Sequence, residues 1–277
     1  MRVQVITTRS ELAAWPHDRT RAVVMTMGAL HDGHAALMDA ARSIVGPEGD
    51  VVVTVFVNPL QFGAGEDFDA YPRPRDADER VCADHGVDVL FMPDVTEMYG
   101  SGGQHITIDP GDLGDILEGE FRPGHFRGML TVVAKLLFLT QADIALFGEK
   151  DYQQLVCIRR MVDELAFPTQ IVGVPTVREP DGLARSSRNV YLDAEDRRRA
   201  ARIPLALDAA RAGLVDGVDH ALAAARRVLD EDAGIEVEYL TVRALDLGDA
   251  KPGPVRILLA ARLGSTRLID NVEGHLP

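Results

Sequence analysis

The first half of the chain alternates short runs of β-branched and other apolar residues with longer stretches of helical periodicity. Apolar runs at 22–27, 51–57 and 87–92 are separated by helical patterns at 34–43 and 76–85. Such alternation is typical of βαβ units around a parallel sheet. The runs at 51–57 and 87–92 show no clean exchange of apolar and polar positions, which indicates strands covered on both faces. We therefore predict that they lie in the centre of the sheet.

The same alternation continues to about residue 176. After a glycine-rich turn it predicts a short strand at 104–108, a helix at 128–140, a strand at 143–148, a helix at 151–165 and a strand at 169–174. Beyond residue 192 the chain is richer in Ala and Arg, and the order of elements changes. Here the pattern predicts helices at 194–213 and 219–231, followed by strands at 236–245, 256–264 and 266–272.

Helices followed by strands without crossover helices favour a small α+β domain with an antiparallel sheet. A length of 277 residues fits two domains at roughly 100–200 residues each. We predict an α/β, Rossmann-like parallel-sheet domain over residues 1–176 and a smaller α+β domain over residues 177–277. We expect the second domain to close over the first.

The composition is that of an ordinary folded protein, with 46% hydrophobic and 26% charged residues, which excludes disordered and coiled-coil classes. The 29 Lys and Arg against 43 Asp and Glu give a net charge of −14. This charge repels phosphate backbones, so we expect no nucleic-acid partner. An anionic small molecule would need a local cluster of backbone N–H groups and cationic side chains.

Cysteine usage indicates a reduced compartment, and hydropathy gives no sign of a membrane span. Cys82 and Cys157 lie in apolar helical stretches without metal spacing, and we expect both to be buried and without a chemical role. The apolar stretch 129–139 contains Lys135 and is shorter than the ~20 residues of a membrane span. We expect a cytoplasmic protein that does not enter a membrane.

The segment 25–34 follows the first predicted strand and opens a helix. In an open α/β sheet, ligands bind beyond the carboxyl ends of the strands, where a helix N-terminus presents unpaired N–H groups to an anion. His31 and His34 are three residues apart, so both face one side of the first turn, and Gly28 and Gly33 allow a nucleotide close to the backbone. Two imidazoles there indicate a phosphate site, although a single His is more often structural.

The run His31-Asp32-Gly33-His34 resembles the H-x-G-H signature of the nucleotidylyl-transferase superfamily, which implies attack at the α-phosphate of ATP and release of pyrophosphate. Four longer motifs accompany it. They are VFVNPLQFGAGEDFDAYPR at 55–73, RPGHFRG at 122–128, FGEKDYQQL at 147–155 and GVPTVREPDGLARSSRNVYL at 173–192. Together they resemble the pantoate–β-alanine ligase (pantothenate synthetase) family over residues 22–192, and more weakly through ARLGSTRLIDN at 261–271.

This resemblance implies a two-step ligase. ATP and (R)-pantoate would give a pantoyl adenylate and pyrophosphate, and β-alanine would then attack the adenylate to give pantothenate and AMP. The resemblance also implies Mg²⁺, held by ATP phosphates and water rather than by protein ligands, and a homodimer. Two other hypotheses stay open: transfer of AMP to a phosphorylated acceptor, and a nucleotide-binding protein without catalysis.

Site residues are carried over from the same resemblance. The catalytic set is His31, His34 and Lys150, with His34 as the general acid or as a purely electrostatic group. The ATP-binding set is Met27, Gly28, His31, Gly33, His34, Gly148, Lys150, Asp151, Val177, Ser186, Ser187 and Arg188, where Asp151 has capping of the next helix as a competing role. The set for pantoate and β-alanine is Gln61, Gln154 and Asn58, where Asn58 has turn formation as a competing role. Glu118, Arg122 and His125 are weaker candidates near pantoate.

Three features of the sequence depart from the family pattern. Met25 stands where the family usually has Pro, which leaves the entry to the loop without a fixed φ. Arg185 replaces an apolar residue and adds positive charge before the Ser-Ser-Arg run. Asp76 and Asp78 do not reproduce the acidic pair that can assist Mg²⁺, so no protein ligand for the metal is assigned.

Overall fold

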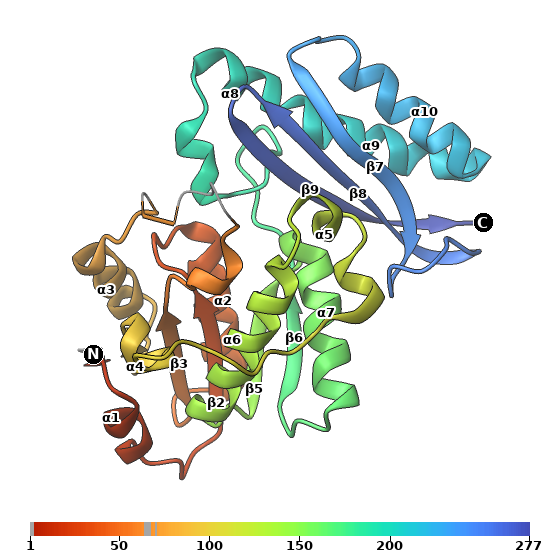
Figure 1. The fold of residues 1–277 in the computed structure, drawn as a ribbon. Coiled ribbons are helices and arrows are strands. Elements are labelled where there is room, and N and C mark those ends of the chain that lie inside the picture. The colour runs from red at the N-terminus through yellow and green to blue at the C-terminus, as the bar shows by residue number, and fades with distance from the viewer. Residues whose placement is uncertain (1–2, 64–67, 70) are drawn as a thin grey trace. The chain divides into compact units, whose positions relative to one another are not determined.

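The computed structural model describes residues 3–63, 68–69 and 71–277, and the chain divides into two compact units (Figure 1). One unit comprises Met1–Glu149 and Gln153–Pro175, and the other comprises Lys150–Tyr152 and Thr176–Pro277. Each unit has its own sheet.

The sheet of the first unit has six strands, and every pair is parallel. Their order is β1-β4-β3-β2-β5-β6. The strands are β1 (Gln4–Ile6), β2 (Arg21–Thr26), β3 (Asp50–Val55), β4 (Val89–Phe91), β5 (Ile144–Gly148) and β6 (Gln170–Val174). The central position of β3 and the burial of β4 confirm the expectation from their unbroken apolar runs.

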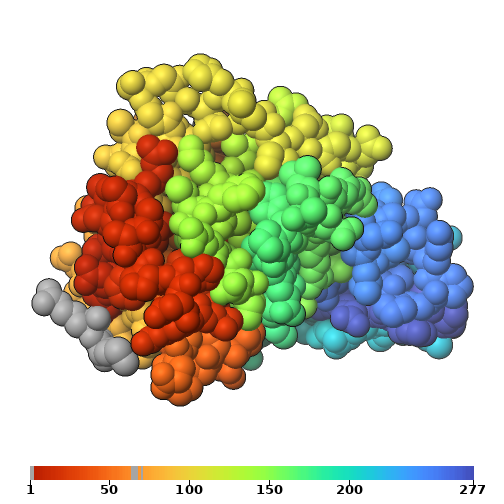
Figure 2. Space-filling model, turned by 90° about the horizontal axis from the view of Figure 1, so that it is seen from below, coloured from red at the N-terminus to blue at the C-terminus, as the bar shows by residue number. Residues whose placement is uncertain are grey.

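Helices cover both faces of this sheet. The helices between residues 9 and 164 are α1 (Arg9–Ala14), α2 (Asp32–Val45), α3 (Arg75–Asp84), α4 (Val95–Tyr99), α5 (Glu118–Phe121), α6 (His125–Thr140) and α7 (Tyr152–Glu164). Val24, Val53 and Leu146 share one face and form a core cluster with Met38 of α2 and Cys82 of α3. Residues of the opposite parity face the other side. On that side α6 packs against β2 and α1, and the α1 and α6 segments lie side by side on the surface (Figure 2).

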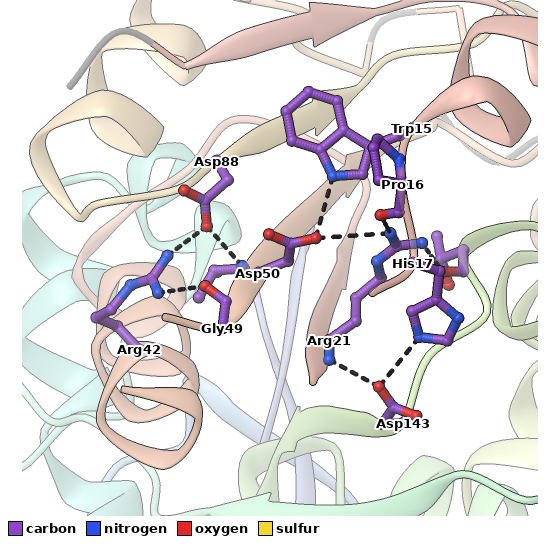
Figure 3. A network of polar contacts seen from close by, with 11 residues as sticks. Trp15, Pro16, His17, Arg21, Arg42, Gly49, Asp50, Asp88 and Asp143 are labelled. Atoms are coloured by element: carbon purple, nitrogen blue, oxygen red, sulfur yellow. Dashed lines mark hydrogen bonds and ion pairs between the residues drawn. The ribbon is translucent and has the colours of Figure 1, made fainter. Parts of the chain in front are cut away.

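The amino ends of the central strands meet in a buried polar network (Figure 3). Arg21 opens β2 and is 1% exposed. Its guanidinium donates to the carbonyl oxygens of Thr140 (2.7 Å) and Pro16 (2.6 Å) and lies 3.6 Å from the carboxylate of Asp50, which opens β3. The Trp15 Nε1–H donates to the same carboxylate at 3.1 Å. The buried charge is therefore compensated at once by a carboxylate and by two carbonyls.

Two further aspartates extend this network to β5 and β4. Asp143 precedes β5 and accepts the backbone N–H of Arg21 at 2.7 Å. Asp88 precedes β4 and accepts the backbone N–H of Val51 at 2.8 Å, together with the guanidinium of Arg42 (Figure 3). Four neighbouring strands are thus fixed to one another where they begin.

The second unit contains an antiparallel sheet in the order β7-β8-β9, with strands Ile235–Ala244, Gly253–Leu263 and Thr266–Leu276. Helices α8 (Ala194–Ala200), α9 (Arg202–Gly213) and α10 (Val218–Leu229) precede it. Ile257 and Leu259 of β8 pack with Leu207 of α9 and Ala225 of α10 in one core cluster. The α/β fold with a smaller α+β unit is confirmed.

Some predicted elements differ from the structure. Residues 104–108 form no strand, because Ile106 is 81% exposed and Ile108 N–H donates to the Thr131 hydroxyl instead of to a neighbouring strand. The helix predicted at 194–213 is two helices, since Pro204 has no N–H to continue the hydrogen bonding from α8. The edge strand β1 was not predicted, because three residues are too few for a pattern.

Cys82 and Cys157 are both buried free thiols, as expected. Burial raises the pKa of each thiol to about 12, and the nearby Asp78 and Glu79 carboxylates add to the shift at Cys82. Across the part of the chain that the structure describes, no helix combines the length and the apolar character that a membrane crossing requires.

We predict that Asp50→Ala lowers the free energy of unfolding by about 3 kcal/mol, because it leaves the Arg21 guanidinium buried without its carboxylate. Urea titration followed by circular dichroism measures this change. Asp18→Ala removes an exposed carboxylate from the loop between Pro16 and Arg21, and it should change the free energy of unfolding by less than about 0.5 kcal/mol. Equal effects of the two substitutions would show that the network does not stabilise the sheet.

Candidate active site

The two histidines of the signature cap helix α2 with their side chains. His31 is the N-cap residue, and its Nδ1 accepts the backbone N–H of Gly33 at 3.1 Å. The His31 N–H in turn donates to Nδ1 of His34 at 3.2 Å, and the two ring centroids are 4.1 Å apart. Because each Nδ1 is an acceptor, the neutral rings carry their protons on Nε2. The helix start therefore presents two Nε2–H donors from adjacent rings.

The loop before these histidines is anchored by Asp78, in the first turn of α3. Asp78 is 1% exposed, and its carboxylate accepts the backbone N–H groups of Ala29 (3.1 Å) and Leu30 (2.8 Å). Burial raises the pKa of Asp78, and the two N–H groups oppose that rise. From the sequence, Asp78 was considered only in relation to a metal. Both of its oxygens instead accept hydrogen bonds from the loop.

Gly28 is required by this anchoring. Its φ is +87°, and a Cβ at this position would lie 2.9 Å from Oδ2 of Asp78 and 3.0 Å from Cγ1 of Val55. The loop therefore passes too close to α3 and β3 for a side chain. Met27 and Gly28 lie directly between β2 and the capping histidines.

A second polar cluster follows β3. Asn58 is fully buried, and its Oδ1 accepts the Leu60 N–H (3.2 Å) and the Tyr99 hydroxyl (2.6 Å). Its Nδ2 donates to Oε1 of Gln61 (2.9 Å) and to the Gly128 carbonyl (3.1 Å). Asn58 thus forms a turn, which was its competing role on sequence grounds, and it orients the side-chain amide of Gln61.

The start of α6 packs against this turn. A Cβ at Gly128 would lie 1.9 Å from the Leu60 carbonyl oxygen, so this helix can approach only with glycine there. The His125 Nδ1–H donates to the Gln61 carbonyl at 3.0 Å, and Nε2 of His125 accepts from Arg122 at 3.1 Å. The segment containing Arg122 and His125 therefore supports Gln61 by a hydrogen bond to the Gln61 backbone carbonyl.

The buried residue Gln153 supports the neighbouring segment. Its Oε1 accepts the Glu118 N–H at 3.0 Å, while its Nε2 donates to the carbonyls of Leu113 and Ile116. Gln154, the residue carried over as a pantoate ligand, follows it in α7 and is half-buried. Gly148 ends β5, and a Cβ there would meet nothing within 4 Å.

The remaining nucleotide residues belong to the second unit. Nζ of Lys150 lies 3.8 Å from the carboxylate of Asp151. The Val177 carbonyl accepts the Arg185 N–H at 2.9 Å and so closes a hairpin that leads into Ser186. The Ser186 hydroxyl then accepts the Arg188 N–H at 3.2 Å and caps the short helix Ser187–Tyr191.

The predicted residues lie in both units, with Gly148 and Gln154 in the first. Met27, Gly28, His31, Gly33 and His34 form one loop, and Asn58 and Gln61 form a second cluster, both in the first unit. Lys150, Asp151, Val177, Ser186, Ser187 and Arg188 lie in the second unit. Residues 64–67 and 70 of the motif at 55–73 lie outside the described residues. Within the described ranges, no group of three or more His, Cys, Asp or Glu could hold a metal ion.

An all-parallel sheet with an H-x-G-H helix start at its carboxyl edge defines an α/β protein of the nucleotidylyl-transferase type. The family model described as pantoate-beta-alanine ligase matches residues 4–273, and the chain belongs to this family. A relative from Frankia alni, "Pantothenate synthetase 4", is 57% identical over 267 residues, which cover 96% of this chain and 86% of the relative. The "Pantothenate synthetase" of a Nocardioides species is 52% identical, over 96% of this chain and 83% of that relative.

Solved structures agree with this assignment. Pantothenate synthetase from Thermus thermophilus has a TM-score of 0.90 at 46% identity, and 98% of this chain and 99% of that chain are covered. Pantoate-beta-alanine ligase from Francisella tularensis has a TM-score of 0.81 at 33% identity, and the match covers 98% of this chain and 97% of that chain. That structure is described as complexed with "Beta-gamma ATP and Beta-alanine".

We predict that Asp78→Asn accelerates hydrogen exchange at the Ala29 and Leu30 amides about tenfold or more, because a charged acceptor is lost to two N–H groups. Hydrogen–deuterium exchange of a peptide spanning residues 27–34 measures this. Asp76→Asn is the matched control, since Asp76 lies in the same first turn of α3 but is exposed. Unchanged protection in Asp78→Asn would mean that the loop holds its conformation without the carboxylate.

Proposed function

We propose that the protein condenses (R)-pantoate with β-alanine at the expense of ATP, through a pantoyl adenylate. The observation that carries the proposal is the pair of His31 and His34 rings capping α2, each of which accepts a backbone N–H at Nδ1, so that the proton of the neutral ring belongs on Nε2. Donors at a helix N-terminus favour a phosphate whose charge increases during displacement. Membership of the ligase family supports pantoate and β-alanine as the two molecules that are joined. The Francisella structure, described as a complex with ATP and β-alanine, supports two of the three substrates.

The chemistry needs activation because a carboxylate is a poor electrophile. In the first step a pantoate carboxylate oxygen attacks the α-phosphorus of ATP, and the bond to pyrophosphate breaks. In the second step the β-alanine amine attacks the acyl carbon, AMP leaves with the bond electrons, and the amine loses a proton. The intermediate is a mixed anhydride that water would hydrolyse, so the site must exclude water.

The geometry favours a hydrogen-bonding role for His34 over that of a general acid. Its Nδ1 is engaged as an acceptor by the His31 N–H, and a doubly protonated ring would place a second donor against that N–H. An Nε2–H donor stabilises developing charge without transferring its proton. His31 acts in the same way, because its Nδ1 accepts from Gly33.

The other residues of the proposed site bind ATP or pantoate. Lys150 and Arg188 neutralise phosphate charge, and Ser186 and Ser187 bind phosphate together with the loop of Met27, Gly28 and Gly33. Gly148 and Val177 lie against the nucleotide, and Asp151 belongs to the ATP site as a hydrogen-bond acceptor and not as a phosphate ligand. Gln61 and Gln154 hold pantoate by hydrogen bonds, and Asn58 acts by orienting Gln61. Magnesium enters as the complex with ATP, because Asp78 has both oxygens committed to the loop.

The division of labour between domains belongs to the same proposal. Residues 1–176 bind ATP and pantoate, and residues 177–277 form a lid that shields the adenylate. Lys150–Tyr152, although they precede residue 177, group with the second unit. The homodimer that the family resemblance implies stays a prediction.

Exchange of labelled pyrophosphate into ATP tests the proposed reaction. With Mg²⁺ present and β-alanine withheld, exchange should occur only when (R)-pantoate is added, because the first step is then reversible. Addition of β-alanine should release free AMP. Exchange without pantoate, or AMP recovered covalently in a dinucleotide, would contradict the proposal and favour a nucleotidyl transferase. ATP binding without any exchange would favour a protein without catalysis.

The roles of His34 and Lys150 are tested by substitution. We predict that His34→Ala and Lys150→Ala each slow adenylate formation by at least ~100-fold in the exchange assay. His34→Asn is the sharper variant, since its Oδ1 can still accept the His31 N–H while no Nε2–H donor is present. His105→Ala and Lys251→Ala remove exposed side chains of the same types and should leave the rate unchanged. Near-normal exchange in His34→Asn would remove the Nε2–H from the mechanism.

A further inference from the structure

Two adjacent residues of β9, Asp270 and Asn271, have no part in the assignments above. They close the ARLGSTRLIDN motif at 261–271 and are 3% and 4% exposed. Neighbouring residues of a strand point to opposite faces of the sheet. Asp270 pairs with Leu259, which belongs to the helix-covered core, so Asn271 lies on the other face.

Asp270 holds the hairpin that leads to the Ser-Ser-Arg run. Its carboxylate accepts two hydrogen bonds from the guanidinium of Arg178, at 2.7 and 3.0 Å. Arg178 also donates to the Gly182 carbonyl at 2.9 Å and forms an antiparallel bridge with Ala184. A bidentate pair of this kind fixes orientation as well as position. Arg178 lies between Val177 and the rest of the hairpin, so the carboxylate fixes the base of the segment that continues into Ser186.

Asn271 holds the segment that contains the other cation. Its Nδ2 donates to the backbone carbonyl of Lys150 at 2.9 Å. The same segment is secured two residues on by Tyr152, whose hydroxyl donates to the Leu245 carbonyl at 2.9 Å. The guanidinium of Arg256, on β8, lies over the Tyr152 ring at 4.0 Å. Residues 150–152 are therefore fixed on one face of the sheet of the second unit.

The two anchors are also linked to each other. The Asn271 backbone N–H donates to Oδ1 of Asp270 at 2.7 Å, and the Asn271 carbonyl accepts from Arg178 at 3.2 Å. A displacement of either residue would therefore disturb both contacts.

We infer that Asp270 and Asn271 are positioning residues for ATP: from opposite faces of one strand they hold the two segments that contain Lys150 and Ser186–Arg188 at a fixed separation. The inference rests on the proposed function, which assigns those segments to the triphosphate. Neither residue touches ATP itself; each acts through the backbone of a phosphate-binding segment. Fixed separation matters because a misplacement of about 1 Å costs on the order of 100-fold in rate.

Asp270→Asn and Asn271→Asp test the inference. Asp270→Asn keeps the volume but loses the charge that holds Arg178, and Asn271→Asp keeps the volume but cannot donate to the Lys150 carbonyl. We expect each to weaken ATP binding about tenfold in calorimetric titration with ATP alone, as the loss of one charge-assisted or buried hydrogen bond implies. The KM for ATP should rise by the same factor, while the KM for pantoate stays within about twofold of the unsubstituted value.

Glu238→Gln is the matched control. Glu238 is a carboxylate of β7, in the same sheet, that accepts from Arg267 of β9 at 2.6 Å and from Arg262 of β8 at 3.0 Å. Its side chain is 8% exposed, and both of these partners lie outside the phosphate segments. Thermal unfolding of all variants measures the structural cost. Asn271→Asp does not remove the Arg178 pair, so it remains informative if Asp270→Asn does not fold.

Weaker ATP binding in Asp270→Asn or Asn271→Asp, with Glu238→Gln unchanged at comparable thermal stability, would support the inference. Equal ATP affinity in all three variants, or a loss of active protein with both KM values unchanged, would overturn it and leave these residues a purely structural role. Failure of the proposed function is distinguished separately, because it shows as absent pantoate-dependent exchange in the unsubstituted protein, while the calorimetric comparison still stands.

Discussion

The common direction of the six strands in the first sheet is the constraint on which the rest of that unit depends. A parallel sheet is covered by helices on both faces, so the polar ends of its strands must be satisfied at its two edges. At the amino edge this is done by Asp143 and Asp88, which accept the backbone N–H groups of Arg21 and Val51 beside the buried Arg21–Asp50 pair (Figure 3). At the carboxyl edge the chain instead turns into loops, and there His31, Asp78 and Asn58 satisfy backbone groups. The amino edge is closed by buried polar contacts, and the carboxyl edge contains the loops of the candidate site.

In both units, buried polar side chains hold the backbone of the segments proposed to bind ATP. Asp78 holds the loop before α2 through two N–H groups, and Asp270 and Asn271 hold the segments of the second unit. Apolar packing would bury the same area without fixing direction, whereas hydrogen bonds are directional and a bidentate pair more so. The cost is the desolvation of each buried group, and at Asp78 the two N–H groups offset it only in part, because burial still raises the pKa of this carboxyl.

Much of the fold was accessible from the sequence. Unbroken apolar runs predicted the central strands, because burial on both faces removes the need for alternation. The pattern failed where local signals were short or ambiguous. Residues 104–108 alternate like a strand but have no ladder partner, and the three residues of β1 form a strand only because β4 offers an edge to pair with. Pro204 marks the start of α9, but the helical spacing continues on either side of it and so predicted a single helix.

The sequence by itself determined the local parts of the site: the histidine pair at three-residue spacing, the glycine at position 28 and the family motifs. These depend on neighbours along the chain, so their spacing is informative. Only the tertiary structure decided which side chains hold those parts in place. Asp78 is 48 residues from Leu30, and Asn271 is 121 residues from Lys150. Contacts over such separations leave no periodic trace, because the geometry that creates them exists only after the strands have paired and the helices have packed.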